Sequence, residues 1–271
     1  MRSRTLERTF SERTSERAFL GVSALIFAAS TAVTIVWCGS MSTMGGMEMP
    51  GGWTMSMAWM RMPGQTWVGA AATFVGMWAV MMVAMMLPSL VPMLLRYRRA
   101  VGVEGEERLG RLTAIVSAGY FLVWTASGVV AFPLGVALAA VEMRQPAIAR
   151  AVPFAVGWIV AIAGVLQFTA WKARHLACCR AEPGYGRVMA ADTGTAWRHG
   201  LRLGLHCITA CAGPTAILLV LGVMDLRAMA VVGAAITAER LAPAGVGVAR
   251  VVGAAAGVAG LFLITQALRM A

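Results

Sequence analysis

The chain is organised as long apolar runs separated by short polar stretches that carry arginine. The apolar runs cover residues 18–38, 66–95, 112–140, 153–171, 200–223, 227–241 and 246–268. Most of them reach the length of about 20 residues that a helix needs to cross a bilayer. Their apolar residues are continuous rather than alternating, which disfavours a transmembrane β-barrel. The pattern therefore predicts an all-α, polytopic transmembrane helix bundle of about seven spans, or six if the short run at 227–241 does not cross.

Composition agrees with a membrane protein and limits its partners. Apolar residues make up 59% of the 271 residues and charged residues only 13%, whereas about 25% of a soluble domain is charged. The formal net charge is +11, but the arginines lie mostly between apolar runs, where they orient a membrane protein. We therefore expect the lipid bilayer, and no nucleic acid, as the partner of the basic residues.

Basic residues concentrate in alternate connections between the runs. The stretches 1–17, 96–111 and 172–199 each carry several arginines, whereas the connection 39–65 carries only Arg61. Because basic connections stay on the cytosolic side, we predict a cytosolic N-terminus, an outer connection at 39–65 and, with seven spans, an outer C-terminus. The expected organisation is a cytosolic basic tail, residues 1–17, and a single transmembrane domain, residues 18–271, in a bacterial inner membrane.

The second span holds an unusual run of methionines. Six lie between Met77 and Met93, and four of them fall in the inner half of the span: Met81, Met82, Met85 and Met86. Leucine or valine would serve a lipid-facing surface equally well, whereas soft thioether ligands favour Cu(I). Methionine is also a common gap-filler in helix packing, so a packing role is the alternative to a metal site.

The fifth span contains two cysteines, Cys207 and Cys211, that lie one helical turn apart and share a face. At 1.5 Å per residue, Cys207 and Met85 both lie about 10–15 Å from the inner ends of their helices. A cluster of thiols and thioethers at this shared depth would suit Cu(I). His206 is offset from Cys207 by about 100° and would contribute from an adjoining face.

The outer connection 39–65 is rich in glycine, serine and methionine. Its methionines follow M-x-x-M and M-x-M spacings, and the candidate ligands among them are Met41, Met44, Met47 and Met49. A flexible connection of this kind is not expected to bury its methionines in a core, which favours capture of Cu(I) or Ag(I). The alternative is an amphipathic interfacial segment anchored by tryptophans.

Two further groups lie toward the predicted inner side. His175, Cys178 and Cys179 form an H-x-x-C-C pattern beyond the fourth span, a candidate exit or docking point for the metal. Glu239 is the one carboxylate well inside an apolar run, where an ionisable group is a functional candidate by default. Because Arg240 follows it, we expect a local ion pair or snorkelling, with ion or proton passage as the alternative.

Several motifs extend along most of the chain. They are M-W-x-x-M-M-x-A-M-M-x-P-S from Met77, G-Y at Gly119 with Trp124, Q-x-T-x-x-K from Gln167, and E-R-x-x-P from Glu239. Together they resemble an uncharacterised bacterial family of predicted metal-binding integral membrane proteins, from Trp67 to Gly260. The resemblance implies a helical membrane fold and soft or imidazole metal ligands, with His175 and Cys179 at positions where the family pattern has two cysteines.

The fifth span matches that pattern only in part. Gly200 and Gly204 form a G-x-x-x-G spacing, which permits close helix packing. Ala210 and Ala212 stand where the family pattern has a cysteine and a tryptophan, so one potential thiolate is missing. The resemblance therefore implies a sulfur site with fewer thiolates than the family pattern provides.

These features favour a Cu(I)-binding membrane protein that acts in copper uptake, transfer or delivery to a partner cuproprotein. The absence of histidine pairs within the spans disfavours an oxidoreductase with haem or a di-iron centre, although a thiol or metal centre is an alternative. An accessory subunit of a larger membrane complex, packed through glycine and alanine, is the other alternative. No Walker A pattern is present, so ATP-driven pumping by this chain alone is not expected. The sequence favours a protein that is not an enzyme and leaves the oxidoreductase as the alternative.

Overall fold

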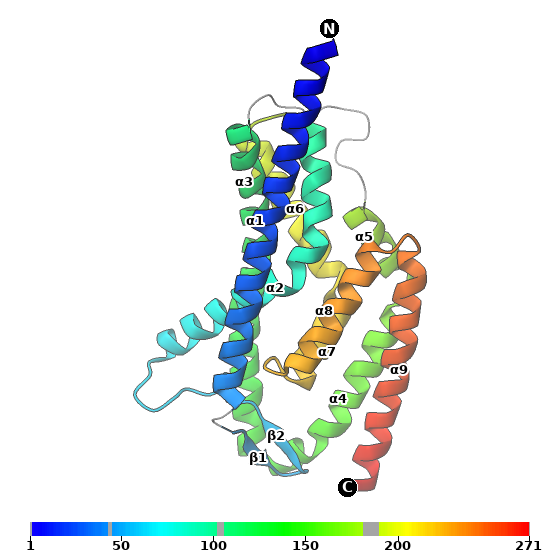
Figure 1. Cartoon of the computed structure of the whole chain (residues 1–271). Coiled ribbons are helices and arrows are strands. Elements are labelled where there is room, and N and C mark those ends of the chain that lie inside the picture. The colour runs from blue at the N-terminus through cyan, green and yellow to red at the C-terminus, as the bar shows by residue number, and fades with distance from the viewer. Residues whose placement is uncertain (1, 43–44, 102–105, 181–189, 271) are drawn as a thin grey trace.

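The computed structural model describes residues 2–42, 45–101, 106–180 and 190–270. The helices are α1 (Arg2–Ser42), α2 (Trp67–Val101), α3 (Glu106–Arg144), α4 (Pro146–Leu166), α5 (Ala170–Arg180), α6 (Thr193–Ala210), α7 (Ala212–Leu221), α8 (Leu226–Leu241) and α9 (Gly245–Met270). A hairpin of β1 (Met47–Met49) and β2 (Trp53–Met55), followed by the short 3-10 helix η1 (Met57–Trp59), joins α1 to α2 (Figure 1). The predicted all-α class is confirmed, with this hairpin as a small addition.

Five of the described helices are long and apolar enough to cross a membrane. They are α1, α2, α3, α4 and α9, and α6 and α7 together form a sixth candidate that is bent by 63°. The run at 227–241 forms α8, which has 16 residues and falls short of the length of a typical span. Figure 1 shows the two termini at opposite ends of the bundle, with α8 beside α9.

Helix α2 lies at the centre of the bundle. In its most apolar window 56% of the residues are buried, whereas the corresponding windows of α1, α3 and α9 are each 17% buried. Its Trp78 donates through Nε1 to the backbone carbonyl of Trp124 on α3 at 2.9 Å, and both rings are fully buried. The methionine-rich segment is therefore an interior helix, and lipid-facing packing does not explain its composition.

Two helix pairs approach closely through glycine. A Cβ at Gly200 of α6 would collide with the backbone of Val116 on α3, and one at Gly204 would lie 3.0 Å from the carbonyl oxygen of Tyr120. The G-x-x-x-G spacing thus produces the predicted close packing, here between α6 and α3. Helices α4 and α9 meet in the same way, since a Cβ at Gly164 would lie 2.7 Å from the carbonyl oxygen of Gly253.

The connection 39–65 contains ordered structure, contrary to the prediction of a flexible segment. Strands β1 and β2 pair antiparallel with Met49 opposite Trp53. Their turn contains Gly51 at φ +107°, a conformation that favours glycine. The Nε1 of Trp53 donates to the carbonyl of Ala149 at 2.8 Å, so the hairpin docks on the start of α4.

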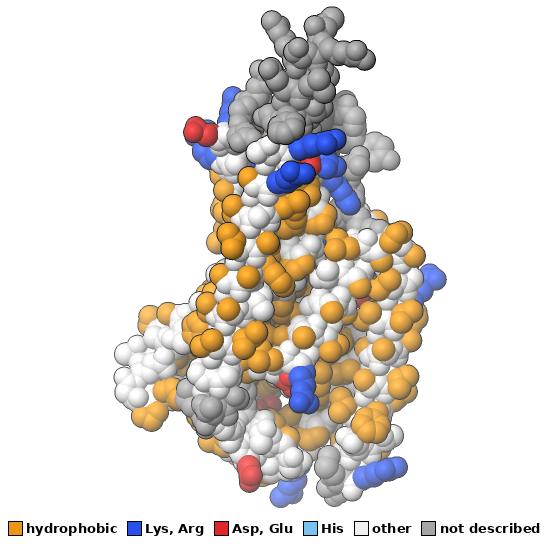
Figure 2. All heavy atoms as spheres, viewed as in Figure 1, with side chains coloured by type: hydrophobic (Ala, Val, Ile, Leu, Met, Phe, Trp, Pro, Cys, Tyr) orange, Lys and Arg blue, Asp and Glu red, His pale blue; other side chains and the backbone are white. Residues whose placement is uncertain are grey.

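The exterior of the bundle is apolar over most of its length. Large apolar side chains are exposed on every long candidate span, among them Val36, Val68, Leu134, Val165 and Val251. Figure 2 shows apolar side chains spread over the visible helices, with basic side chains near the two ends of the bundle and few between them. Such an exterior is compatible with a membrane protein, because lipid accepts apolar side chains that water would not.

Candidate metal centre

The helix that carries both predicted cysteines is broken between α6 and α7. Pro214, in the first turn of α7, has no backbone N–H, so the carbonyl of Ala210 loses the donor that a continuous helix would supply. The Nζ of Lys172 on α5 donates to that carbonyl at 2.6 Å instead. A proline in the broken helix and a lysine from a neighbouring helix therefore determine where the bend occurs.

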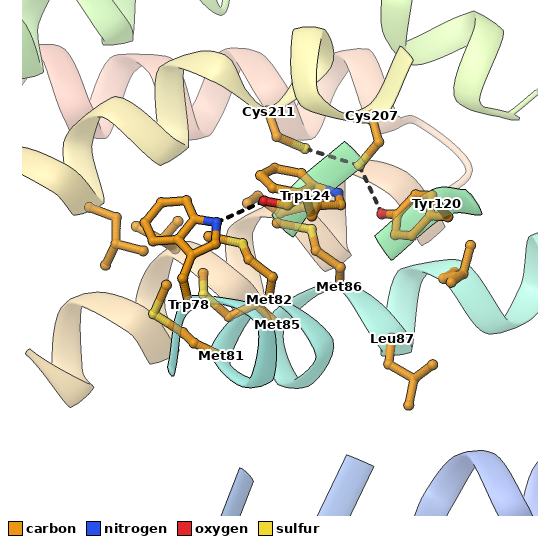
Figure 3. Packing of buried hydrophobic residues seen from close by; sticks show 14 of the residues in the cluster. Trp78, Met81, Met82, Met85, Met86, Leu87, Tyr120, Trp124, Cys207 and Cys211 are labelled. Carbon is orange, nitrogen blue, oxygen red and sulfur yellow. Dashed lines mark hydrogen bonds between the residues drawn. The ribbon is translucent and has the colours of Figure 1, made fainter. Parts of the chain in front are cut away.

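The two thiols lie side by side at this break. The Sγ atoms of Cys207 and Cys211 are 3.9 Å apart, and both residues are buried. The Sγ of Cys207 is also 3.0 Å from the hydroxyl of Tyr120 on α3, with which it shares a hydrogen bond. Figure 3 shows both thiols above the ring of Trp124, which separates them from α2. The prediction that the cysteines share a face is confirmed.

Arg240 of α8 places a buried positive charge against this thiol pair. Only 3% of the residue is exposed, and its guanidinium donates to the Sγ of Cys207 at 3.0 Å. It also donates to the hydroxyls of Ser89 and Tyr120 and to the Sδ of Met93. The ion pairs found in the described part of the chain do not include Arg240. Since a buried cation needs an anion to compensate it, Cys207 is the group placed to supply that anion.

Glu239 pairs with Lys172 and not with its neighbour Arg240, which corrects the expectation of a local ion pair. The Nζ of Lys172 donates to a carboxylate oxygen of Glu239 at 2.6 Å, and both side chains are buried. The amide of Gln167 donates to the other carboxylate oxygen at 2.8 Å. On a helix, adjacent residues point in different directions, so Glu239 and Arg240 serve two separate polar networks.

The four methionines of α2 belong to the same buried cluster as the thiols. Figure 3 shows Met82 and Met86 rising from α2 toward Trp124, whereas Met81 is directed away from the thiols. Met85 packs against α8, where a Cβ at Gly233 would lie 3.7 Å from its Cγ. Of the four methionines, Met82 and Met86 therefore come nearest to the sulfur cluster with Cys207 and Cys211 that the sequence predicts.

The predicted histidine ligands face each other across α5 and α6, with His175 on α5 and His206 on a face of α6 next to the one that carries Cys207. The rings of His206 and His175 have centroids 6.0 Å apart, and the Nδ1 of His175 is 3.2 Å from the hydroxyl of Thr209. A cavity of about 190 Å³ is lined by Met93, Arg96, Cys178, Cys179, His199, Arg202, Leu203 and His206. Among the described residues, no three His, Cys, Asp or Glu side chains are placed to hold one metal ion.

The methionines of the outer connection separate into different environments. Met49 of β1 is buried in a cluster with Ala139 and Ala149, whereas Met47 is exposed. Met41 lines a second cavity together with Met57 and Met224, and Met44 lies outside the described residues. The four candidate ligands therefore do not form one cluster within the described part of the connection.

A comparison with protein families relates this arrangement to copper. The model of the PpoB2 family, described as copper chaperones, matches residues 75–263. The chain belongs to the PpoB2 family. This membership supports a copper-related function and a metal-binding family, in line with the motif resemblance. No curated protein and no solved structure matches the chain.

The part that matches the PpoB2 family begins within α2 and ends within α9. It includes the thiol pair, the methionines of α2 and both buried polar networks. It leaves out α1, the hairpin and η1. The copper-related description therefore applies to the helices around the break, whereas the methionines of the outer connection lie outside the matched residues.

Sequence reasoning missed the polar residues that surround the thiols and the helix break. Tyr120, Gln167, Lys172 and Arg240 stand in the recognised motifs, but none of them is a soft metal ligand. Two signals could have identified them. Lys172 and Arg240 are cations at the edges of apolar runs, and Pro214 marks a point within a run where a helix must leave a carbonyl unpaired.

One prediction concerns thiol reactivity and orientation. Cys178 is exposed, and the other four cysteines are buried. Burial raises the pKa of the Cys179 thiol to about 12, so it remains a poorly reactive neutral thiol at neutral pH. We expect a membrane-impermeant maleimide to modify Cys178 in inside-out vesicles and not in right-side-out vesicles. Cys178→Ser should remove the labelling, and labelling from the opposite side would reverse the predicted topology.

Proposed function

We propose that this chain is an integral membrane protein of the bacterial inner membrane that binds Cu(I) at the α6–α7 break and delivers it to a partner cuproprotein. The observation that carries this proposal is the buried pair of thiols, Cys207 and Cys211, with a guanidinium against one of them. Thiolates and thioethers are the ligands that select Cu(I). Copper is the cargo of the protein in this proposal.

The charge around the break suits a monovalent metal. A Cu(I) ion bound by two thiolates carries one surplus negative charge, and the guanidinium of Arg240 can neutralise it. Lys172 and Glu239 already compensate each other, so they add no net charge to the site. Charges that are balanced in this way can be buried at acceptable cost, whereas a divalent ion would leave one positive charge uncompensated.

The thioethers of Met82 and Met86 suit the role of a neighbouring soft shell. They approach Trp124 from the side opposite the thiols (Figure 3). The electron-rich face of an indole also attracts a cation. A copper ion at the thiol pair would therefore meet sulfur on one side and an aromatic ring backed by sulfur on the other, which supports transient rather than permanent holding.

Cu(I) binding by the purified full chain tests the proposal. In competition with a chromophoric Cu(I) chelator, the double variant Met82→Leu/Met86→Leu should bind Cu(I) on the order of 10-fold more weakly, as expected for groups that surround a metal. Leucine is close to methionine in volume, so packing should change little. The variant Met143→Leu is the control, because Met143 is an exposed methionine of α3. Wild-type protein that binds no Cu(I) would contradict the proposal.

A further inference from the structure

Three methionines converge on a cavity at the hairpin end of the bundle. The cavity measures about 200 Å³ and is lined by Met41, Gly45, Gly46, Ser56, Met57 and Met224. Met41 comes from the last turn of α1, Met57 from η1, and Met224 from the turn between α7 and α8. The three thioethers are far apart in the sequence, so only the fold brings them together. Each of the three is half-buried, so the cavity is accessible from outside.

The chemistry of this lining is uniform. It holds three thioethers, one hydroxyl and no charged, imidazole or thiol group. Hard divalent cations prefer carboxylate, carbonyl and water oxygen, whereas thioethers select monovalent soft ions such as Cu(I) and Ag(I). Thioether sulfur also has no proton to lose, unlike cysteine or histidine, so binding here requires no deprotonation.

One residue that lines the cavity also contacts the buried sulfur cluster. Met224, which lines it, packs against the core cluster that contains the methionines of α2 and α8 and both thiols at the break. Val223 next to it is a buried member of that cluster. The cavity therefore borders the packed cluster that also contains Cys207 and Cys211.

We propose that Met41, Met57 and Met224 form an entry site that captures a monovalent soft metal ion before it reaches the thiol pair. The fate of the ion after capture rests on the proposed function, whereas the capture itself does not. The proposal differs from the sequence prediction of a methionine-rich connection, because it assigns binding to one cavity. It includes Met224, a residue of the distant α7–α8 turn, and excludes the exposed Met47. Met41 and Met57 also lie outside the part that matches the PpoB2 family.

Silver binding to the purified full chain tests the entry site, because Ag(I) binds thioether ligands and is stable against changes of oxidation state. In mildly acidic buffer, the triple variant Met41→Leu/Met57→Leu/Met224→Leu should lose one equivalent of bound Ag(I) relative to wild type. The matched control is Met47→Leu/Met60→Leu/Met62→Leu, which replaces three methionines of the same connection that do not line the cavity. The control should retain every equivalent.

The outcomes separate this proposal from the function proposed above. If the cavity variant keeps its full Ag(I) stoichiometry, or the control loses as much as the cavity variant, the entry site is wrong. A Cys207→Ser/Cys211→Ser variant measured in parallel reports on the break. If it keeps all its metal while the cavity variant loses one equivalent, the buried site is wrong and the entry site stands. Met224→Leu alone should weaken Ag(I) binding measurably, and it changes no residue of the connection 39–65. This single variant tests the entry site if the triple variant does not fold.

Discussion

Replacing either thiol at the α6–α7 break by a hydroxyl is expected to abolish tight Cu(I) binding. Cys207→Ser and Cys211→Ser each remove one of the two thiolates and substitute a hard oxygen that Cu(I) binds poorly. Loss of a residue that only surrounds a metal ligand costs about 10–100-fold in affinity. Loss of a ligand itself should therefore cost at least on the order of 100-fold.

The two substitutions should differ in their effect on stability. Cys207 accepts a hydrogen bond from Arg240 at 3.0 Å and lies against the hydroxyl of Tyr120. Serine at that position keeps a small polar acceptor but cannot supply a readily formed anion to the buried guanidinium. Cys211 has no contact of this kind with Arg240 among the hydrogen bonds of the described residues. We therefore expect Cys207→Ser to lower the midpoint of thermal unfolding more than Cys211→Ser.

Chelator competition and X-ray absorption at the copper edge measure this prediction. Wild-type protein should show sulfur-only coordination, which the two variants should lose. Cys38→Ser and Cys178→Ser are the matched controls, since one replaces a buried thiol of α1 and the other an exposed thiol of α5. Cu(I) affinity of Cys211→Ser equal to that of wild type would place the copper elsewhere in the chain.

The sulfur groups of the site could be found from the sequence, because helical spacing alone places Cys207 and Cys211 on one face. The same reasoning put the methionines of α2 at a similar depth, and the structure buries them in one cluster. The direction of each methionine could not be predicted. It depends on where Trp124 and Gly233 of other helices come to lie, and that information is spread over the whole fold.

The polar networks illustrate a different limit. Glu239 and Arg240 are neighbours in the chain, so a local pair was the natural expectation. Each instead finds its partners across the bundle, Glu239 at Lys172 and Arg240 at Cys207. Sequence adjacency on a helix separates two side chains by about 100°. Which partner each one meets is therefore decided by tertiary packing.

The hairpin shows how composition can mislead. A connection rich in glycine and serine predicted a flexible segment, yet the glycines of its turn permit the tight reversal between β1 and β2. The tryptophan of β2 then anchors it through a hydrogen bond to α4. Glycine is compatible with both flexibility and a tight turn, so only the partners of the neighbouring residues distinguish the two outcomes.

The second large effect is expected from Lys172→Met. The substitution leaves the carboxylate of Glu239 buried without a cation and the carbonyl of Ala210 without a donor. Breaking one partner of a buried ion pair typically costs about 3–5 kcal/mol. The free energy of unfolding should fall by about this amount, and the break should also shift, because Lys172 satisfies the carbonyl that Pro214 leaves unpaired. Cu(I) binding should weaken as a consequence.

A second substitution distinguishes electrostatics from packing. Glu239→Gln removes the orphaned charge, so Lys172→Met/Glu239→Gln should be more stable than Lys172→Met alone, although the unpaired carbonyl of Ala210 persists in both. Arg174→Met is the matched control, because Arg174 is an exposed cation two residues farther along α5. Thermal unfolding measures the wild type and these three purified variants. If Lys172→Met unfolds at the same temperature as Arg174→Met, the buried pair contributes nothing to the fold, and a different interaction must hold the break that presents the two thiols.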